Sequence, residues 1–243
     1  MEQQGKENRI WEIDFLRGLL IPGMILIHII YDAVSLYGLV PWQYPRWYVA
    51  IQSNYGALFL LVSGISVTLG SRCVLRGVTV FSAGMLCTAA TLGMYLLGMA
   101  DRGIIIYFGV LHCIGVCMVL WQVFRKWPLW ALGLLGAALA VVGLYLRGQV
   151  FDFPWLVVFG FTFPGFSSSD YFPLMPNLGY FLMGCALGKG LYRRRQSLLP
   201  RVPHDGPVIG TVMAWGRHSL MIYLLHQPVL AAVFQGIMMM KRL

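Results

Sequence analysis

The chain has 243 residues, of which 58% are hydrophobic and 11% are charged, and its mean hydropathy is +0.72. A soluble domain of this length needs more charged side chains to cover its surface. The composition therefore excludes a soluble protein and indicates an integral membrane protein. The 18 Lys and Arg against 9 Asp and Glu give a net charge of +9, but the basic residues cluster in short loops between apolar runs. We therefore expect a lipid bilayer as partner and no nucleic acid.

Apolar runs of about 20 residues are needed to cross about 30 Å of hydrocarbon as a helix. The chain contains seven such runs, and we expect an all-α, polytopic membrane protein with about seven transmembrane helices in one domain, 1–243. The last run is overlong, so it either bends at Pro228 or begins with an interfacial turn before Trp215. The predicted spans are 15–37, 48–71, 74–99, 103–124, 128–147, 171–191 and 207–240.

The connection 148–170 is apolar but interrupted by Pro and Gly, so we interpret it as a re-entrant or interfacial segment. With the N-terminus in the cytoplasm, eleven Lys and Arg residues fall on the inner side and five on the outer side. An eighth span at 148–170 would move the basic cluster 193–195 outside. The positive-inside rule therefore favours seven crossings and a cytoplasmic N-terminus.

The first predicted span carries four ionisable residues, Asp14, Arg17, His28 and Asp32. At 3.6 residues per turn they share a sector of about 60° on one helix face. Each such residue near the bilayer centre costs roughly 2.5–3.5 kcal/mol on insertion scales, so the stripe indicates a buried polar pathway or reaction site.

His28 and Asp32 stand one helical turn apart. A carboxylate at this spacing can hydrogen-bond the imidazole, fix its tautomer and favour its charged form. The pair can then act as general base toward a hydroxyl or amine and return the proton to a leaving group. The alternative is a structural polar pair that holds helices together.

His112 in the fourth predicted span and His226 in the last are two further candidate catalytic residues. Ser219, Tyr223 and His226 lie within about 60° of one another on their helix, which makes a second polar stripe. Each histidine taken alone also fits a packing role. No two of the three histidines share a helix and the cysteines lack zinc-ligand spacing, so we expect no metal.

Asp14 and Arg17 fall at the predicted cytoplasmic interface. They form either an ion pair between spans or a site where Arg17, with Arg76 or Arg217, receives phosphate groups. On the outer side, Asp170 either caps the sixth helix or holds an acceptor sugar or amine.

Five motifs follow one another in order: Arg9-x4-Asp14-x2-Arg17-Gly with His28, Leu58-Phe-Leu-Leu-Val-Ser-Gly64, Leu111-His112-x-Ile-Gly115, Asp170-Tyr-Phe-Pro-Leu-x-Pro176 with Gly179, and Gly216-Arg-His-Ser-Leu-x-Ile-Tyr-Leu-Leu-His226-Gln-Pro228. Together they resemble the bacterial branch of the heparan-α-glucosaminide N-acetyltransferase catalytic-domain family, from residue 9 to about residue 230. The opening pattern is also similar to that of the type-3 membrane O-acyltransferases. In those enzymes the matching histidine is catalytic, which implies that role for His28.

The resemblance implies transfer of an acetyl group from cytoplasmic acetyl-CoA to an amino sugar or other glycan or small-molecule acceptor, in a bacterial cytoplasmic membrane. The chain departs from the lysosomal branch, whose catalytic histidine lies after the first span, because it has no histidine between His28 and His112. We expect three groups of site residues: catalytic His28, Asp32, His112 and His226; donor-binding Arg9, Asp14, Arg17, Arg76 and Arg217; and substrate-binding Asp170, Asn177 and Tyr223.

Two other functions compete with the acyltransferase. One is a proton-coupled multi-pass transporter that uses His28, Asp32 and His226 as a relay. The other is a membrane scaffold without catalysis. The lack of an internal repeat argues against the transporter, and the ionisable stripe argues against the scaffold. Self-association into a homo-oligomer stays open.

Overall fold

The computed structural model describes residues 10–204 and 206–241. Helices form nearly all the regular structure in this part of the chain, and β-structure is limited to two isolated bridges. The all-α prediction is therefore confirmed. Contacts divide the chain into two compact units, Met1–Phe59 with Gln196–Leu243 (unit 1) and Leu60–Arg195 (unit 2).

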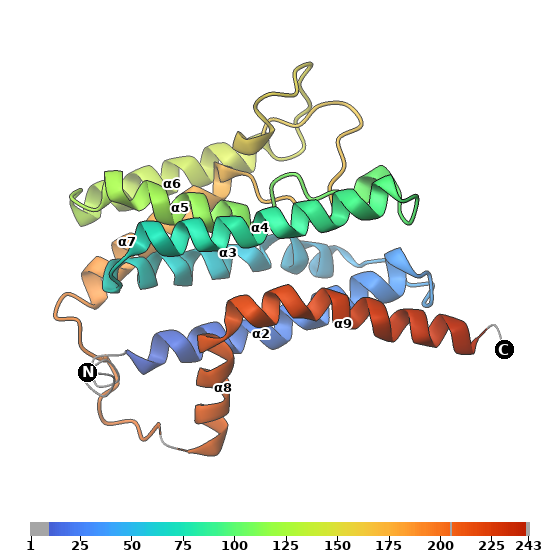
Figure 1. The fold of residues 1–243 in the computed structure, drawn as a ribbon. Helices are drawn as coiled ribbons and strands as arrows, with labels where there is room; N and C mark the ends of the chain where they lie inside the picture. Colours follow the sequence, from blue (N-terminus) through green and yellow to red (C-terminus); the bar gives the residue numbers. More distant parts are fainter. Residues whose placement is uncertain (1–9, 205, 242–243) are drawn as a thin grey trace. The chain divides into compact units, whose positions relative to one another are not determined.

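Unit 1 joins the two ends of the sequence. Its core is α2, which packs against both α8 and α9 (Figure 1). Its elements are α2 (Trp11–Tyr31), the π-helical turn η1 (Asp32–Leu36), the first part of α3 (Arg46–Leu69), α8 (Pro207–Arg217) and α9 (Ser219–Met240).

Glycine allows α2 and α8 to approach closely. A Cβ on Gly216 would strike the backbone of Asp14, and one on Gly18 would strike the backbone of Val212. From α3, the Tyr55 hydroxyl donates to the Leu20 carbonyl at 2.9 Å. Small residues at helix contacts are typical of membrane bundles, where close van der Waals packing replaces the hydrophobic effect.

Unit 2 is a bundle in which α4 packs against α5, and α6 packs against α7. The end of α3 rests on α7, where Gly184 meets the backbone of Leu61 and Gly188 meets Thr68. Close packing thus accounts for the GxxxG at these two glycines. Its elements are the end of α3, α4 (Cys73–Leu96), η2 (Arg102–Ile104), α5 (Val110–Phe124), α6 (Leu129–Leu146), η3 (Val157–Phe159) and α7 (Leu174–Leu191).

The segment predicted as re-entrant or interfacial forms an irregular loop after α6 that includes η3 and the bridge between Val150 and Thr162. Its end is tied to the segment before α5, because the Phe172 N–H donates to the Phe108 carbonyl at 2.9 Å. These backbone contacts hold the residues before α5 in an extended form. The predicted span 103–124 is therefore α-helical only from Val110.

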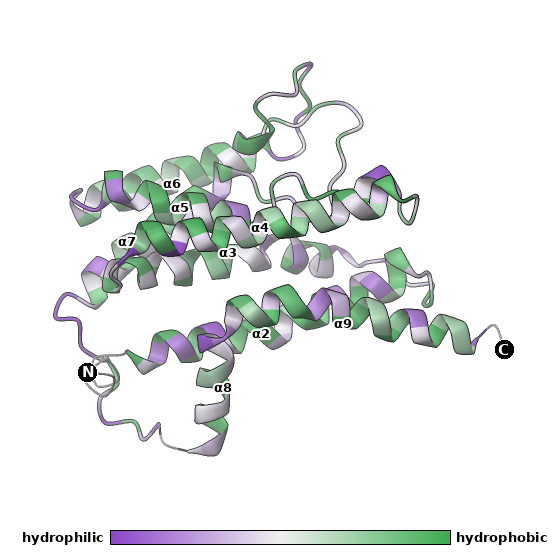
Figure 2. Cartoon of the chain, in the orientation of Figure 1, coloured by the Kyte–Doolittle hydropathy of each residue, from purple (hydrophilic) through white to green (hydrophobic). Residues whose placement is uncertain are grey.

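In the part of the chain that the structure describes, five helices are long and apolar enough to cross a membrane. Figure 2 shows them coloured mainly as hydrophobic, with hydrophilic bands within α2 and α9. The predicted count of seven spans is not confirmed. At 1.5 Å per residue, the 15 residues of α5 rise only about 22 Å, and Asn, Gly and Lys dilute the apolar character of α7.

The predicted single span 207–240 is two helices. The break falls at His218, after Trp215, where the backbone leaves helical geometry between α8 and α9. Neither predicted alternative is confirmed: the residues before Trp215 are helical, the break follows Trp215, and Pro228 stands inside α9.

Candidate active site

Two of the predicted catalytic residues, His28 on α2 and His226 on α9, meet in unit 1. Their ring centroids are 4.6 Å apart and their planes are inclined by 78°, an edge-to-face contact. His28 is half-buried, and His226 is 9% exposed. Residues separated by most of the sequence therefore form one imidazole pair.

Backbone carbonyls set the tautomer of both rings. His28 Nδ1 lies 2.9 Å from the Met24 carbonyl, and His226 Nδ1 lies 2.6 Å from the Tyr223 carbonyl. A carbonyl oxygen only accepts, so each Nδ1 carries the hydrogen. In the neutral rings each Nε2 therefore keeps a lone pair, the state that a general base or nucleophile requires.

Two hydrogen-bond acceptor atoms, on adjacent residues of α9, lack a donor in the described part of the chain. His226 Nε2 and Gln227 Oε1 are buried and have no hydrogen-bond partner among the described residues. Leaving a buried acceptor unpaired costs about 1–3 kcal/mol, and such atoms call for an explanation. A bound molecule with N–H or O–H groups would satisfy both.

The Asp32 carboxylate is fully buried and is held by Gln227. The Gln227 Nε2 donates to both carboxylate oxygens at 3.1 Å. The Met24 carbonyl, and not Asp32, accepts from His28 Nδ1 and fixes the tautomer of that ring. A hydrogen bond between Asp32 and His28 stays a prediction. Asp32 begins the π-helical turn η1, a distortion found often at functional sites.

Tyr223, a predicted substrate-binding residue, borders the pair. Its ring centroid is 5.3 Å from that of His226, inclined by 55°. Ser219, one turn earlier, is the first residue of α9. The stripe of the last helix thus brings a phenol beside the imidazoles.

His112 belongs to unit 2 and differs from the pair. It lies in the first turn of α5 instead of the middle of a span, and it is 2% exposed. Its Nδ1 accepts from the Gly109 N–H at 3.1 Å, so Nε2 carries the hydrogen, directed at the Thr88 hydroxyl 3.3 Å away. Both ring nitrogens are therefore hydrogen-bonded within the protein. His112 stabilises the first turn of α5 and has no free lone pair for proton transfer.

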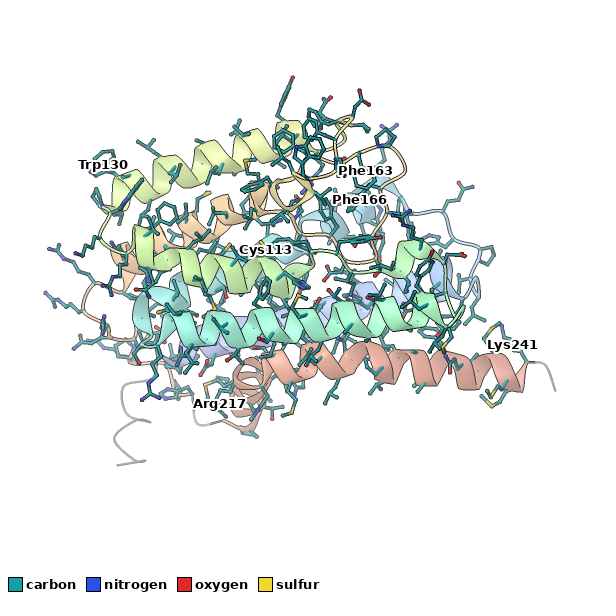
Figure 3. The ribbon with its side chains drawn as sticks, turned by 45° about the horizontal axis from the view of Figure 1, so that its top comes forward. Cys113, Trp130, Phe163, Phe166, Arg217 and Lys241 are labelled. Carbon is teal, nitrogen blue, oxygen red and sulfur yellow. The ribbon has the colours of Figure 1, made fainter. Side chains whose placement is uncertain are left out.

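Asp170 also serves the start of α5. Its Oδ2 accepts from the Val110 N–H at 3.1 Å, so it caps α5, which is the fourth predicted helix. The expectation of a cap on the sixth predicted helix is wrong, because α7 has no side-chain cap. Asn177 in α7 is buried, and its Nδ2 donates to the Pro173 carbonyl at 2.8 Å. In Figure 3, Phe163 and Phe166 mark the loop that leads to Asp170.

The predicted donor-binding residues fall into separate parts of the chain. In unit 1, Arg17 pairs with the buried Asp14 at 3.4 Å, and Arg217 is exposed at the end of α8, where Figure 3 labels it. Gly216 packs on Asp14, so Arg217 follows a residue in contact with this turn of α2. Arg76 belongs to unit 2, with its guanidinium beside Gly70. Arg9 lies outside the described residues.

Comparison with known proteins gives the family. A profile described as heparan-alpha-glucosaminide N-acetyltransferase, catalytic, matches residues 9–228. The chain belongs to this family. Membership, together with the apolar helices, indicates membrane acetyltransferase activity and confirms the resemblance seen in the sequence. The comparisons with curated proteins and with solved structures gave no match.

Gln227 is the site residue that sequence reasoning missed. Its position after His226 gave a weak signal, but its partner Asp32 is 195 residues away, and no local pattern connects the two. Thr88, the partner of His112 Nε2, was missed for the same reason. Among the residues that the structure describes, no group of three His, Cys, Asp or Glu side chains is placed to hold a metal ion.

Proposed function

We propose that the chain transfers an acetyl group from cytoplasmic acetyl-CoA to an amino sugar, or another glycan or small-molecule acceptor, at or across the membrane. The observation that carries this proposal is the His28–His226 pair, in which both Nδ1 atoms donate to carbonyls and both Nε2 lone pairs remain. Family membership supplies the reaction class.

In the transfer step, the acceptor nitrogen or oxygen attacks the thioester carbonyl while its proton passes to an imidazole Nε2. The carbon–sulfur bond then breaks, and the thiol of CoA leaves with the proton from the imidazolium. The buried Asp32 carboxylate, one turn from His28, stabilises the transient positive charge. A general base of this kind contributes typically about 10²–10⁴-fold to the rate.

Direct transfer and a relay through acetyl-His28 both fit two adjacent imidazoles. The relay forms an N-acetyl imidazole and releases CoA before the acceptor binds. It therefore gives ping-pong kinetics and a burst of free thiol when no acceptor is present. Direct transfer releases thiol only with acceptor bound.

The acetyl donor is placed along α2. Arg17 and Arg217 receive its phosphates, and 11 residues of helix separate Arg17 from His28, a rise of about 16 Å. The extended pantetheine arm of CoA spans a distance of this order. The guanidinium groups suit phosphate oxygens because they present paired N–H donors.

The acceptor is placed beside Gln227 and Tyr223. Because Asp32 holds the Gln227 amide nitrogen, Oε1 of the same amide is left as an oriented acceptor. An amine or hydroxyl of the acceptor would donate to it while its reacting proton faces the imidazole pair. The hydrogen bond would satisfy an atom that is otherwise buried without a partner.

The test uses purified protein in detergent, acetyl-CoA labelled in the acetyl group, and a panel of amino sugars and glycans. We expect wild type to label an acceptor and His28→Ala to lose about 10²–10⁴-fold in rate with its thermal unfolding unchanged. His218→Ala, which removes an exposed histidine of the same unit, is the matched control. Equal transfer by His28→Ala and wild type would overturn the assignment.

A further inference from the structure

Unit 2 contains a hollow that the acetyl-transfer proposal does not use. Its volume is about 780 Å³, and it lies where the end of α3, the start of α4 and the ends of α5 and α7 meet. Small-molecule sites in proteins measure about 300–1,000 Å³, so the hollow is large enough to hold a ligand. Six basic residues line it: Arg72, Arg125, Lys126, Lys189, Arg193 and Arg195.

The charged side chains of this hollow are all positive. No Asp or Glu occurs among the described residues that line it. The positive-inside rule accounts for basic residues at one side of the membrane, but it does not require them to converge on a single concave surface. Like charges gathered in a cleft repel one another and raise the local concentration of anions.

The start of α4 adds backbone donors to the same surface. This helix has 24 residues, and its N-cap, Arg72, makes no side-chain capping hydrogen bond. Cys73 and Val74, in the first turn, line the hollow. The first N–H groups of a helix lack partners within it and carry its positive dipole end, which favours phosphate oxygens.

Lys189 is held at the wall by the protein itself. Its Nζ donates to the carbonyls of Arg125 and Trp127 at 2.7 Å and 2.6 Å and lies 5.5 Å from the ring centroid of Trp121. One of its three N–H donors therefore remains for a ligand. Val67 and Leu69 add apolar wall beside these cations.

We propose that this hollow binds a phosphate ester, which is either the headgroup phosphate of an anionic lipid or the phosphate of a soluble metabolite. Cations, uncapped helix N–H groups and apolar wall together match that chemistry. The site goes beyond the acetyl-transfer proposal, which places the donor phosphates on Arg17 and Arg217 of unit 1.

The test measures binding without any acetyl donor or acceptor, so its outcome is independent of the proposed reaction. Inorganic pyrophosphate is titrated by thermal shift against protein in detergent, at low and high salt. In parallel, native mass spectrometry follows the lipid retained from an equimolar mixture of phosphatidylglycerol and phosphatidylcholine. The soluble probe reports a free phosphate, and the lipid mixture reports a headgroup.

The variants compare three cations of the hollow with three outside it. The triple change Arg72→Gln, Arg125→Gln and Arg193→Gln is matched by a control at exposed residues that do not line the hollow: Arg194→Gln, Arg201→Gln and Arg46→Gln. Both triples remove the same charge.

We expect the hollow triple to weaken pyrophosphate binding, or the preference for phosphatidylglycerol, by about tenfold, with the control triple near wild type. A loss of pyrophosphate binding identifies a soluble phosphate as the ligand, and a loss of the lipid preference identifies a lipid headgroup. High salt should weaken pyrophosphate binding. If the triple does not fold, Arg193→Gln against Arg194→Gln gives the same comparison for adjacent residues. Equal behaviour of hollow and control variants, or no binding of either probe by wild type, overturns the proposal.

Discussion

The histidines of the two units are used in opposite ways. In unit 1, His28 and His226 donate from Nδ1 to carbonyls, so Nε2 keeps its lone pair. In unit 2, His112 accepts at Nδ1 from a backbone N–H and faces a hydroxyl with Nε2. Histidine therefore has a lone pair available for proton transfer in unit 1, whereas in unit 2 both of its ring nitrogens form hydrogen bonds that stabilise the fold. The deciding factor is whether Nδ1 meets a carbonyl or an N–H.

The largest expected effect comes from changing the pair. His28→Ala and His226→Ala should each lower the rate of acetyl transfer by about 10²–10⁴-fold, because each removes an imidazole from one proton-transfer unit. The double variant should lose little more than the worse single variant, since residues that act as a unit are non-additive. Steady-state rates of the four proteins measure this. Additive losses would show that the two rings act independently.

His112→Ala should act on stability instead of chemistry. It leaves the Gly109 N–H without its partner and opens a cavity beside Phe81 and Phe108, whose ring centroids lie 5.3 Å and 5.6 Å away. We expect a loss of about 3 kcal/mol in the free energy of unfolding in detergent. The rate per folded molecule should stay within about tenfold of wild type. A stable but inactive variant would place His112 in the reaction.

Gln227→Leu should separate acceptor binding from donor binding. The change removes the amide that holds Asp32 and the unpaired Oε1, so the KM for the acceptor should rise about tenfold while that for acetyl-CoA is unchanged. Gln235→Leu, at an exposed position of the same helix, is the control. A rise in the KM of acetyl-CoA alone would contradict the placement of the acceptor.

Asp170→Ala gives the smallest effect. It removes the cap on the Val110 N–H, and the free energy of unfolding should fall by about 1 kcal/mol. Asp101→Ala is the control, because Asp101 precedes η2 without a capping hydrogen bond. Thermal unfolding of the two variants tests the prediction. If the variant instead raised the KM for the acceptor without loss of stability, Asp170 would belong to the substrate-binding site.

Most helices could be predicted from the sequence because apolar runs and their breaks are local properties. The predicted 128–147 is helical at Leu129–Leu146, and 48–71 at Arg46–Leu69. The errors occur where distant segments meet. Residues before Val110 are extended because they pair with the segment around Phe172, and no periodicity within 103–109 reports that contact.

The sequence by itself determined that the chain is helical, resides in a membrane and belongs to an acetyltransferase family, because composition, periodicity and motif order need no knowledge of contacts. Only the tertiary structure decided that His28 meets His226, that Asp32 is held by Gln227 and that Asp170 caps α5. Each of these pairs joins residues far apart in the chain. The tautomer of a histidine, and with it the chemistry it can perform, depends on which atom the fold places beside its nitrogens.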